Sequence, residues 1–170
     1  MLSKTGFRFH RCRVPLFFAL SLMLLCLAVK ILTPIPLTLM HRLRPSDVFP
    51  PLWLFNLLSM LWYFLLGFAA GSAFDSAASG RAGGRGEIRI YKGGLFFVAL
   101  LFLSLIWYPL FFIGERFFLA LLLVLLSIAS SVLCAVIWSK HSVSVGITVA
   151  AFALWQVYSA FLNLSVFFCL

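Results

Sequence analysis

Neutral hydrogen-bonding groups lie among aromatic side chains in three apolar stretches of the sequence, the first at residues 49–71. Within it, Asn56, Ser59, Tyr63 and Gly67 recur every three or four positions. At that spacing they form one stripe along a helix. A helix surrounded by lipid needs no such stripe, so we expect this one to face other helices or a ligand.

The second and third stretches, near residues 94–114 and 143–169, repeat this combination. Their shared faces carry Phe97, Ser104, Trp107 and Phe111 in the second stretch, and Trp155, Gln156, Ser159 and Asn163 in the third. An apolar cavity with a few neutral polar groups suits a large, flat, hydrophobic ligand. The residues alone leave open a second interpretation, in which the stripes only hold the helices together.

The sequence contains no recognisable framework for catalysis, metal binding or ion coupling. Its carboxylates all fall in expected loops or at helix ends: Asp47, Asp75, Glu87 and Glu115. Ion-coupled transporters usually place ionisable groups inside their spans, and the HExxH, P-loop and GxSxG motifs do not occur. The cysteines stand alone, without the spacing of a metal site or a disulfide framework. We therefore predict no catalytic residues and no metal site.

The composition indicates an all-α integral membrane protein. The chain is 64% hydrophobic, 17% aromatic and 10% charged, so a soluble domain would have too few polar residues to cover its surface. The net charge of +9 comes from basic residues in short segments between apolar runs. That distribution is typical of membrane topology and argues against nucleic acid as a partner.

Five apolar runs predict a single domain over residues 1–170, a five-transmembrane-helix bundle. The expected helices cover 14–33, 51–74, 94–114, 116–139 and 143–169, with loops at 34–50 and 75–93. The first run follows a basic segment but has no convincing cleavage site, so we interpret it as a retained helix with Lys30 snorkelling at its end. Pro50 and Pro51 fit the start of the second helix. Glycine, serine and arginine predict a flexible, basic loop at 75–93.

The basic residues are distributed unevenly between the two ends of this bundle. The end that holds the N-terminus and the 75–93 loop carries Lys4, Arg8, Arg11, Arg13, Arg81, Arg85, Arg89, Lys92 and Lys140. The opposite end carries Arg42, Arg44 and Arg116. The positive-inside rule then predicts a cytoplasmic N-terminus and a C-terminus on the outside.

Three short motifs, in this order along the chain, resemble the TspO/MBR family of tryptophan-rich sensory or translocator proteins. The first comprises Pro50, Pro51, Trp53, Phe55, Tyr63, Gly67 and Ala69; the second Trp107, Pro109, Phe111 and Phe112, with Arg116 after them; the third Trp155, Leu162 and Asn163. The order, spacing and five-span layout agree with the family over nearly the whole chain.

The chain departs from the family pattern at several positions. Ser59 stands where the family usually has a Trp, and Leu100 and Ser104 stand where it has Gln and Asn. Ala151 and Phe152 replace a Pro-Tyr pair, and no basic residue follows Tyr158 to complete a cholesterol-recognition pattern. The smaller residues at 59 and 104 are expected to widen or reshape the pocket.

The resemblance implies a membrane-embedded binding protein for a hydrophobic ligand, a tetrapyrrole such as protoporphyrin IX or haem, or a lipid-like molecule, with a role in sensing, transport or turnover. It implies no required cofactor, and its partners would be that ligand and membrane lipid. The implied ligand-binding residues are Pro51, Trp53, Ser59, Tyr63, Ser104, Trp107, Phe111, Trp155, Ser159 and Asn163. Residues 45–53 would form a lid, and His41, Arg42 and Arg44 would either meet propionate groups or serve as ordinary interfacial charge.

Two other functions stay open at this point. One is light-dependent degradation of bound porphyrin by an enzyme that uses tryptophan chemistry, which the Ser59 departure would affect. The other is a non-catalytic assembly protein, forming a homodimer through Gly67-x-x-x-Gly71. The GxxxG spacing permits close helix approach, but it serves packing within one chain as well as between chains.

Overall fold

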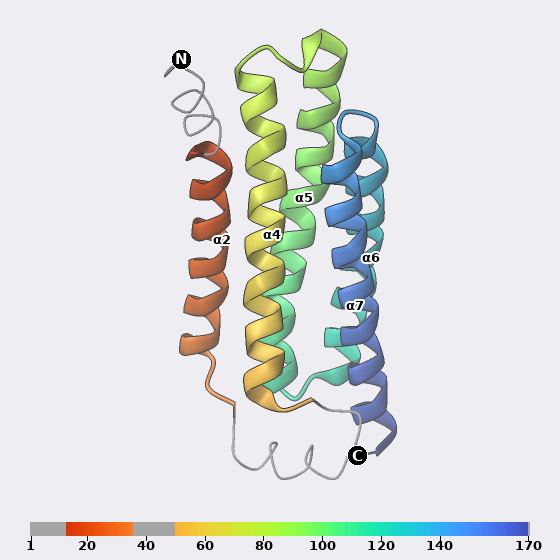
Figure 1. Ribbon diagram of the computed structural model, residues 1–170. Helices are drawn as coiled ribbons and strands as arrows, with labels where there is room; N and C mark the ends of the chain where they lie inside the picture. The colour runs from red at the N-terminus through yellow and green to blue at the C-terminus, as the bar shows by residue number, and fades with distance from the viewer. Residues whose placement is uncertain (1–12, 36–49, 170) are drawn as a thin grey trace.

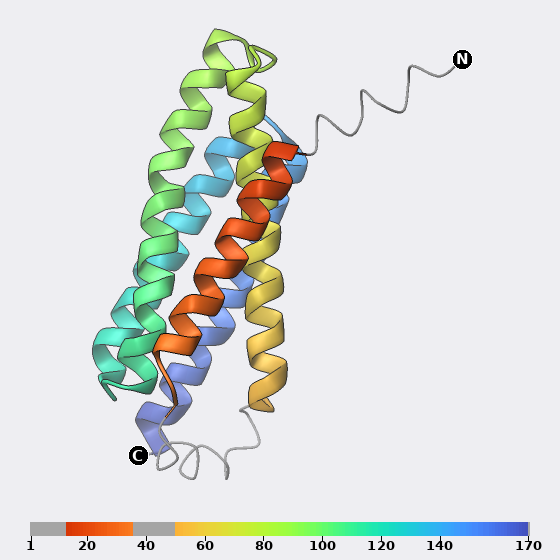
Figure 2. The same ribbon diagram turned by 90° about the vertical axis from the view of Figure 1, so that its left-hand side faces the viewer.

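A computed structural model describes residues 13–35 and 50–169, with side chains as far as residue 166. The described part of the chain forms α2 (Arg13–Leu32), α4 (Leu52–Ala78), α5 (Gly83–Phe112), α6 (Phe117–Ser139) and α7 (Val143–Cys169). These helices run alternately up and down the bundle (Figures 1 and 2). All five are long and apolar enough to cross a membrane. The all-α, five-helix membrane fold expected from the sequence is therefore confirmed.

Helices α4, α5, α6 and α7 pack in a ring, and α2 packs mainly against α4. The closest neighbours are α2 with α4, α5 with α6, and α6 with α7, while α4 also contacts α7 and α5. One buried cluster surrounds Trp138 of α6, whose Nε1–H donates to the Ile90 carbonyl of α5 at 3.1 Å. A second cluster, toward the opposite end, contains Phe55, Trp107 and Phe112.

Two glycines of α4 allow α2 to approach closely. A Cβ on Gly67 would lie 2.5 Å from the Phe18 carbonyl oxygen, and one on Gly71 would lie 2.6 Å from Pro15 Cα. Neither position has room for a side chain. The Gly67-x-x-x-Gly71 motif therefore packs against α2 of the same chain, which is the intrachain role that its spacing also permits.

The prediction of a loop at 75–93 is wrong, because most of this segment is helical. Helix α4 extends to Ala78 and α5 begins at Gly83, so a short turn joins them. Gly80 and Gly83 have φ values of +69° and +63°, which suit glycine and reverse the chain in few residues. Beyond the turn, residues with good helix propensity such as Arg85 and Glu87 continue the helix without needing lipid contact. At 30 residues, α5 is about 45 Å long and exceeds the roughly 30 Å hydrocarbon core.

The other helix ends lie close to their predicted positions. Helices α2, α6 and α7 begin at Arg13, Phe117 and Val143. Glu115, with φ of +46°, lies in the tight turn between α5 and α6. Most of the first expected loop, including His41, Arg42, Arg44 and residues 45–49 of the expected lid, lies outside the described residues.

Candidate functional site

A small cavity lies between α2, α4, α5 and α7, at the end of the bundle that holds the second buried cluster. Its volume is about 30 Å³, small beside the roughly 300–1,000 Å³ of usual ligand pockets. Its aromatic wall consists of Phe55, Tyr63, Trp107, Tyr108, Phe152 and Trp155, and its polar groups include Ser59, Ser104, Gln156 and Ser159. Helix α2 contributes Cys26, Val29 and Lys30.

A buried hydrogen bond joins α4 to α5 beside this cavity. The Tyr63 hydroxyl donates to Ser104 Oγ at 2.9 Å, and the Ser104 hydroxyl donates to the Leu101 carbonyl at 3.1 Å. Both side chains are 6% exposed. This pairing satisfies two polar groups that would otherwise be costly to bury. It also fixes the Tyr63 ring in the cavity wall.

The aromatic side chains of the wall contact one another across three helices. The Phe55 ring of α4 lies 6.4 Å from Trp107 of α5 and 5.5 Å from Trp155 of α7, measured between centroids. Tyr63 makes an edge contact with Phe152 at 6.0 Å. A flat ligand entering between these helices would therefore meet aromatic faces from three directions.

Lys30 gives the cavity wall a positive charge. Its Nζ donates to Asn56 Oδ1 at 2.6 Å and lies 5.4 Å and 5.1 Å from the ring centroids of Phe55 and Tyr108. Ammonium groups at such distances are attracted to aromatic faces. Lys30 thus turns toward α4 and the cavity, which differs from the snorkelling orientation expected from its place at a helix end.

The serine hydroxyls at 59 and 159 bond to their own helices. Ser59 Oγ donates to the Phe55 carbonyl at 2.7 Å, and Ser159 Oγ donates to the Trp155 carbonyl at 3.2 Å. Such bonds satisfy a hydroxyl within a helix without needing a partner on another helix. These small side chains are buried and need no partner on another helix.

Six of the ten residues implied by the family resemblance line the cavity: Ser59, Tyr63, Ser104, Trp107, Trp155 and Ser159. The other four do not. Pro51 is exposed, and the Trp53 side chain is 68% exposed on the outer surface. Phe111 is buried behind Trp107, with stacked rings 5.1 Å apart. Asn163 also lies behind Trp107, and its Oδ1 accepts the indole Nε1–H at 2.9 Å when the amide is oriented to pair with its donors.

The implied set of binding residues omits the contribution of α2, and it omits Tyr108, Phe152 and Gln156, although the sequence places Gln156 on the same polar face as Ser159. Phe55 had been recognised only as part of a motif. A basic residue in the last turn of an otherwise apolar helix was the available signal for Lys30, because intramembrane charges usually face the bundle interior. Among the described residues, no group of three or more His, Cys, Asp or Glu side chains is arranged to hold a metal ion.

The sequence profile of the TspO/MBR family matches residues 16–168. Comparisons with curated proteins and with solved structures found no match.

Proposed function

The chain belongs to the TspO/MBR family, and from this premise we propose that it binds a hydrophobic ligand carrying an acidic group between α2, α4, α5 and α7. The first candidate is a tetrapyrrole such as protoporphyrin IX or haem. The second candidate is a lipid-like molecule with a carboxylate, which also combines an apolar body with an acidic group. The binding would serve sensing, transport or turnover of that ligand.

The observation that carries this proposal is the position of Lys30 in an aromatic wall. Its ammonium group is 5.4 Å from the Phe55 ring centroid, and Phe55 in turn contacts Trp107 and Trp155. Protoporphyrin IX combines a flat apolar ring with propionate groups. The ring suits the aromatic faces, and a propionate in this low-dielectric setting suits a charge-assisted bond to Lys30.

The size of the cavity requires the helices to move apart when such a ligand binds. Ligand pockets usually have volumes of about 300–1,000 Å³, against about 30 Å³ here. Helix α2 is the least embedded wall, since its buried residues are Pro15, Ala19 and Cys26. Its close contacts at Gly67 and Gly71 lie in its first half, away from Lys30. We infer that the second half of α2 moves outward.

A titration with protoporphyrin IX tests the proposal. Purified protein in detergent should show saturable binding, read from the porphyrin absorbance and from quenching of tryptophan fluorescence. Trp155→Phe removes part of the aromatic wall and should weaken affinity by up to about tenfold, because an aromatic contact contributes on the order of 0.5–1.5 kcal/mol beyond its buried area. Trp53→Phe is the matched control, since Trp53 is 68% exposed and outside the cavity.

Two outcomes would count against the tetrapyrrole assignment. Binding that does not saturate would indicate partitioning into detergent. Equal affinity loss in Trp155→Phe and Trp53→Phe would indicate that the porphyrin binds on the surface and not between the helices.

A further inference from the structure

A crevice of about 430 Å³ lies at the opposite end of the bundle from the cavity. It is bordered by the start of α2, the second half of α4, the turn around Arg81 and the start of α7. It shares no lining residue with the cavity described above. The crevice and the cavity are therefore two separate sites.

The lining of the crevice changes character along its length. Toward the middle of the bundle its α4 wall is apolar, with Leu65, Phe68 and Ala69. Toward the end of the bundle it is lined by hydroxyl, imidazole and guanidinium groups, including Ser76, Arg81, His141 and Ser142. From Leu65 to Asp75 the crevice follows α4 for about 15 Å, at roughly 1.5 Å per residue. This is the polarity profile of a molecule with a polar head and an apolar tail.

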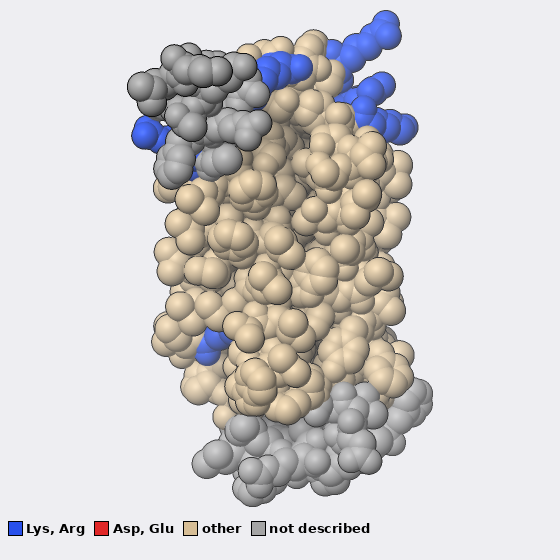
Figure 3. All heavy atoms as spheres, viewed as in Figure 1, with Lys and Arg blue, Asp and Glu red and all other residues tan. Residues whose placement is uncertain are grey.

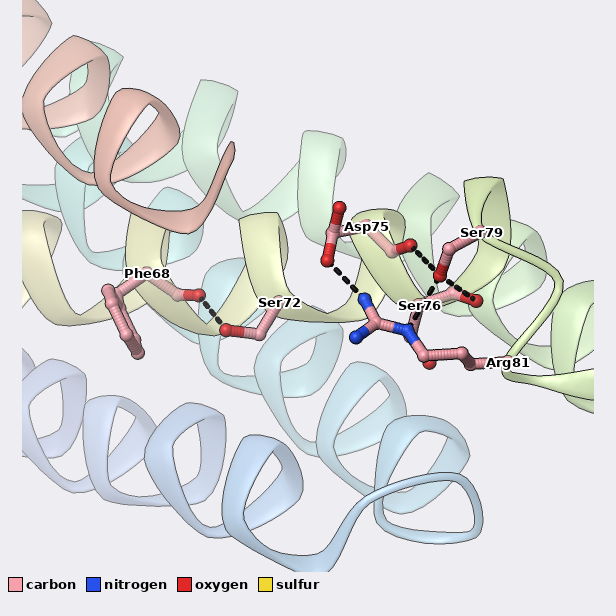
Figure 4. A network of polar contacts seen from close by, with 6 residues as sticks. All are labelled: Phe68, Ser72, Asp75, Ser76, Ser79 and Arg81. Atoms are coloured by element: carbon pink, nitrogen blue, oxygen red, sulfur yellow. Dashed lines mark hydrogen bonds and ion pairs between the residues drawn. The ribbon is translucent and has the colours of Figure 1, made fainter. Parts of the chain in front are cut away.

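Arg81 is held at the polar end of the crevice by α4. Its Nη2 contacts Asp75 Oδ2, and its Nε donates to Ser79 Oγ at 2.7 Å (Figure 4). These bonds use two of the five N–H groups of a guanidinium. Because Asp75 is paired with Arg81, its carboxylate charge is offset at the place where an anion would bind. The guanidinium side chain remains 39% exposed.

Basic side chains surround the polar end of the crevice. The His141 imidazole lies beside α5, where a Cβ on Gly86 would be 3.4 Å from its Nδ1. Arg89 Nη1 donates to the Lys140 carbonyl at 3.4 Å, which brings two further cations to the same turn. Lys and Arg side chains are concentrated at this end of the molecule (Figure 3). The field at the polar end of the crevice therefore favours an anion.

The side of the crevice is bordered by exposed apolar side chains. Leu65 and Phe68, which line it, are 37% and 41% exposed, and Val143 and Ile147 at the start of α7 are 66% and 62% exposed. In a membrane these apolar surfaces contact acyl chains. A molecule with a polar head in the crevice can thus leave its tail in the surrounding bilayer.

We propose that this crevice binds an anionic phospholipid, with the phosphate group near Arg81, His141 and Ser142 and an acyl chain along Leu65 and Phe68. Charge-assisted hydrogen bonds from the guanidinium would hold the phosphate. The site would select anionic over zwitterionic phospholipids and would tie the α4–α5 turn to the membrane surface.

The test is a binding measurement with dioctanoyl-phosphatidylglycerol on the full chain in mild detergent, read from the shift of the thermal unfolding midpoint. We expect a saturable shift at concentrations about tenfold below those needed with dioctanoyl-phosphatidylcholine. The double variant Asp75→Asn/Arg81→Gln removes the ion pair as a unit and should abolish this preference, since a hydrogen bond to a charged group is worth about tenfold in affinity or more.

Three further variants test whether the lipid binds in the crevice and not through surface charge or at the cavity. Arg85→Gln removes the same charge outside the crevice lining and should change the affinity less than twofold. Lys30→Gln alters the other site and should leave phosphatidylglycerol binding unchanged. Ser72→Leu fills the crevice without changing charge and should weaken binding of the lipid.

Three results would overturn the proposal. An equal loss in Arg85→Gln would show a diffuse surface-charge effect. A stability shift of the same size with inorganic phosphate would show an anion site without lipid specificity. The third is a shift with phosphatidylglycerol that never saturates, or that equals the shift with phosphatidylcholine, because a specific anionic site requires both saturation and discrimination.

Discussion

Lys30 Nζ lies 2.6 Å from Asn56 Oδ1, and this hydrogen bond joins the last turn of α2 to the first turns of α4. Both side chains are half-buried, so the bond forms where water has little access. A neutral amide satisfies one of the three ammonium donors but does not neutralise the charge. The lysine is thus paired geometrically while its charge stays available to an acidic ligand.

Replacement of Lys30 by Gln should reduce the affinity for protoporphyrin IX about tenfold or more, because a charge-assisted hydrogen bond is lost. The affinity for its dimethyl ester, which has no carboxylate, should change little. Parallel titrations of the wild type and Lys30→Gln with both porphyrins measure this difference. Equal losses for the acid and the ester would contradict the assignment of a carboxylate to Lys30.

Replacement of Tyr63 by Phe should lower the free energy of unfolding by about 0.5–1.5 kcal/mol, the usual contribution of one hydrogen bond. The partner oxygen of Ser104 keeps its own bond to the Leu101 carbonyl, so no additional donor is left unpaired. Unfolding in a denaturing detergent measures the change. Ser104→Ala and the double variant complete a mutant cycle, and additive losses would contradict a direct Tyr63–Ser104 interaction.

Replacement of Gly67 by Ala should destabilise the fold by about 1–3 kcal/mol, as overpacking of a tight contact usually does. The added Cβ would lie 2.5 Å from the Phe18 carbonyl oxygen of α2, and backbone atoms cannot move as easily as a flexible side chain. Gly84→Ala is the control, because nothing lies within 4 Å of a Cβ there. Thermal unfolding of both variants compares them. Unchanged stability in Gly67→Ala would contradict the α2–α4 contact.

The same two variants also separate intrachain packing from assembly. Since Gly67 and Gly71 face α2 of their own chain, Gly67→Ala should not change the oligomeric size of the folded fraction, measured by light scattering in detergent. A change in size without a loss of stability would favour the assembly function left open by the sequence.

The sequence predicted the helices well where their ends depend on local signals. Pro51 precedes α4 directly, and the turns that end α5 and α6 coincide with short polar segments. The glycine content of residues 75–93 predicts a loop, but most of these glycines do not break the helix. Only Gly80 and Gly83 adopt positive φ, while Gly86 and Gly93 lie inside α5. In Gly93 the missing Cβ makes room for Trp138.

The site was harder to predict than the fold, because its composition depends on how the helices are rotated about their axes. Helical spacing correctly grouped Ser59 with Tyr63, but it could not show that α2 supplies Lys30. Spacing also placed Asn163 on the same face as Ser159, whereas the amide lies behind the Trp107 indole and bonds to it. Residues one turn apart can therefore be on opposite sides of a wall, one in contact with the cavity and the other supporting it.

If the protein only binds protoporphyrin IX, its tryptophans should not accelerate the breakdown of the bound porphyrin under light. Ser59 supplies no indole to the α4 wall, and the Trp107 indole is fixed between the Phe111 ring at 5.1 Å and Asn163 Oδ1 at 2.9 Å. We therefore expect the porphyrin to bleach under illumination at the same rate with the wild type, with Trp107→Phe and with Trp155→Phe, once the rates are corrected for the bound fraction. Absorbance spectra recorded during illumination measure these rates. A new absorbance band that forms with the wild type and is lost with either variant would contradict this expectation and favour the enzyme.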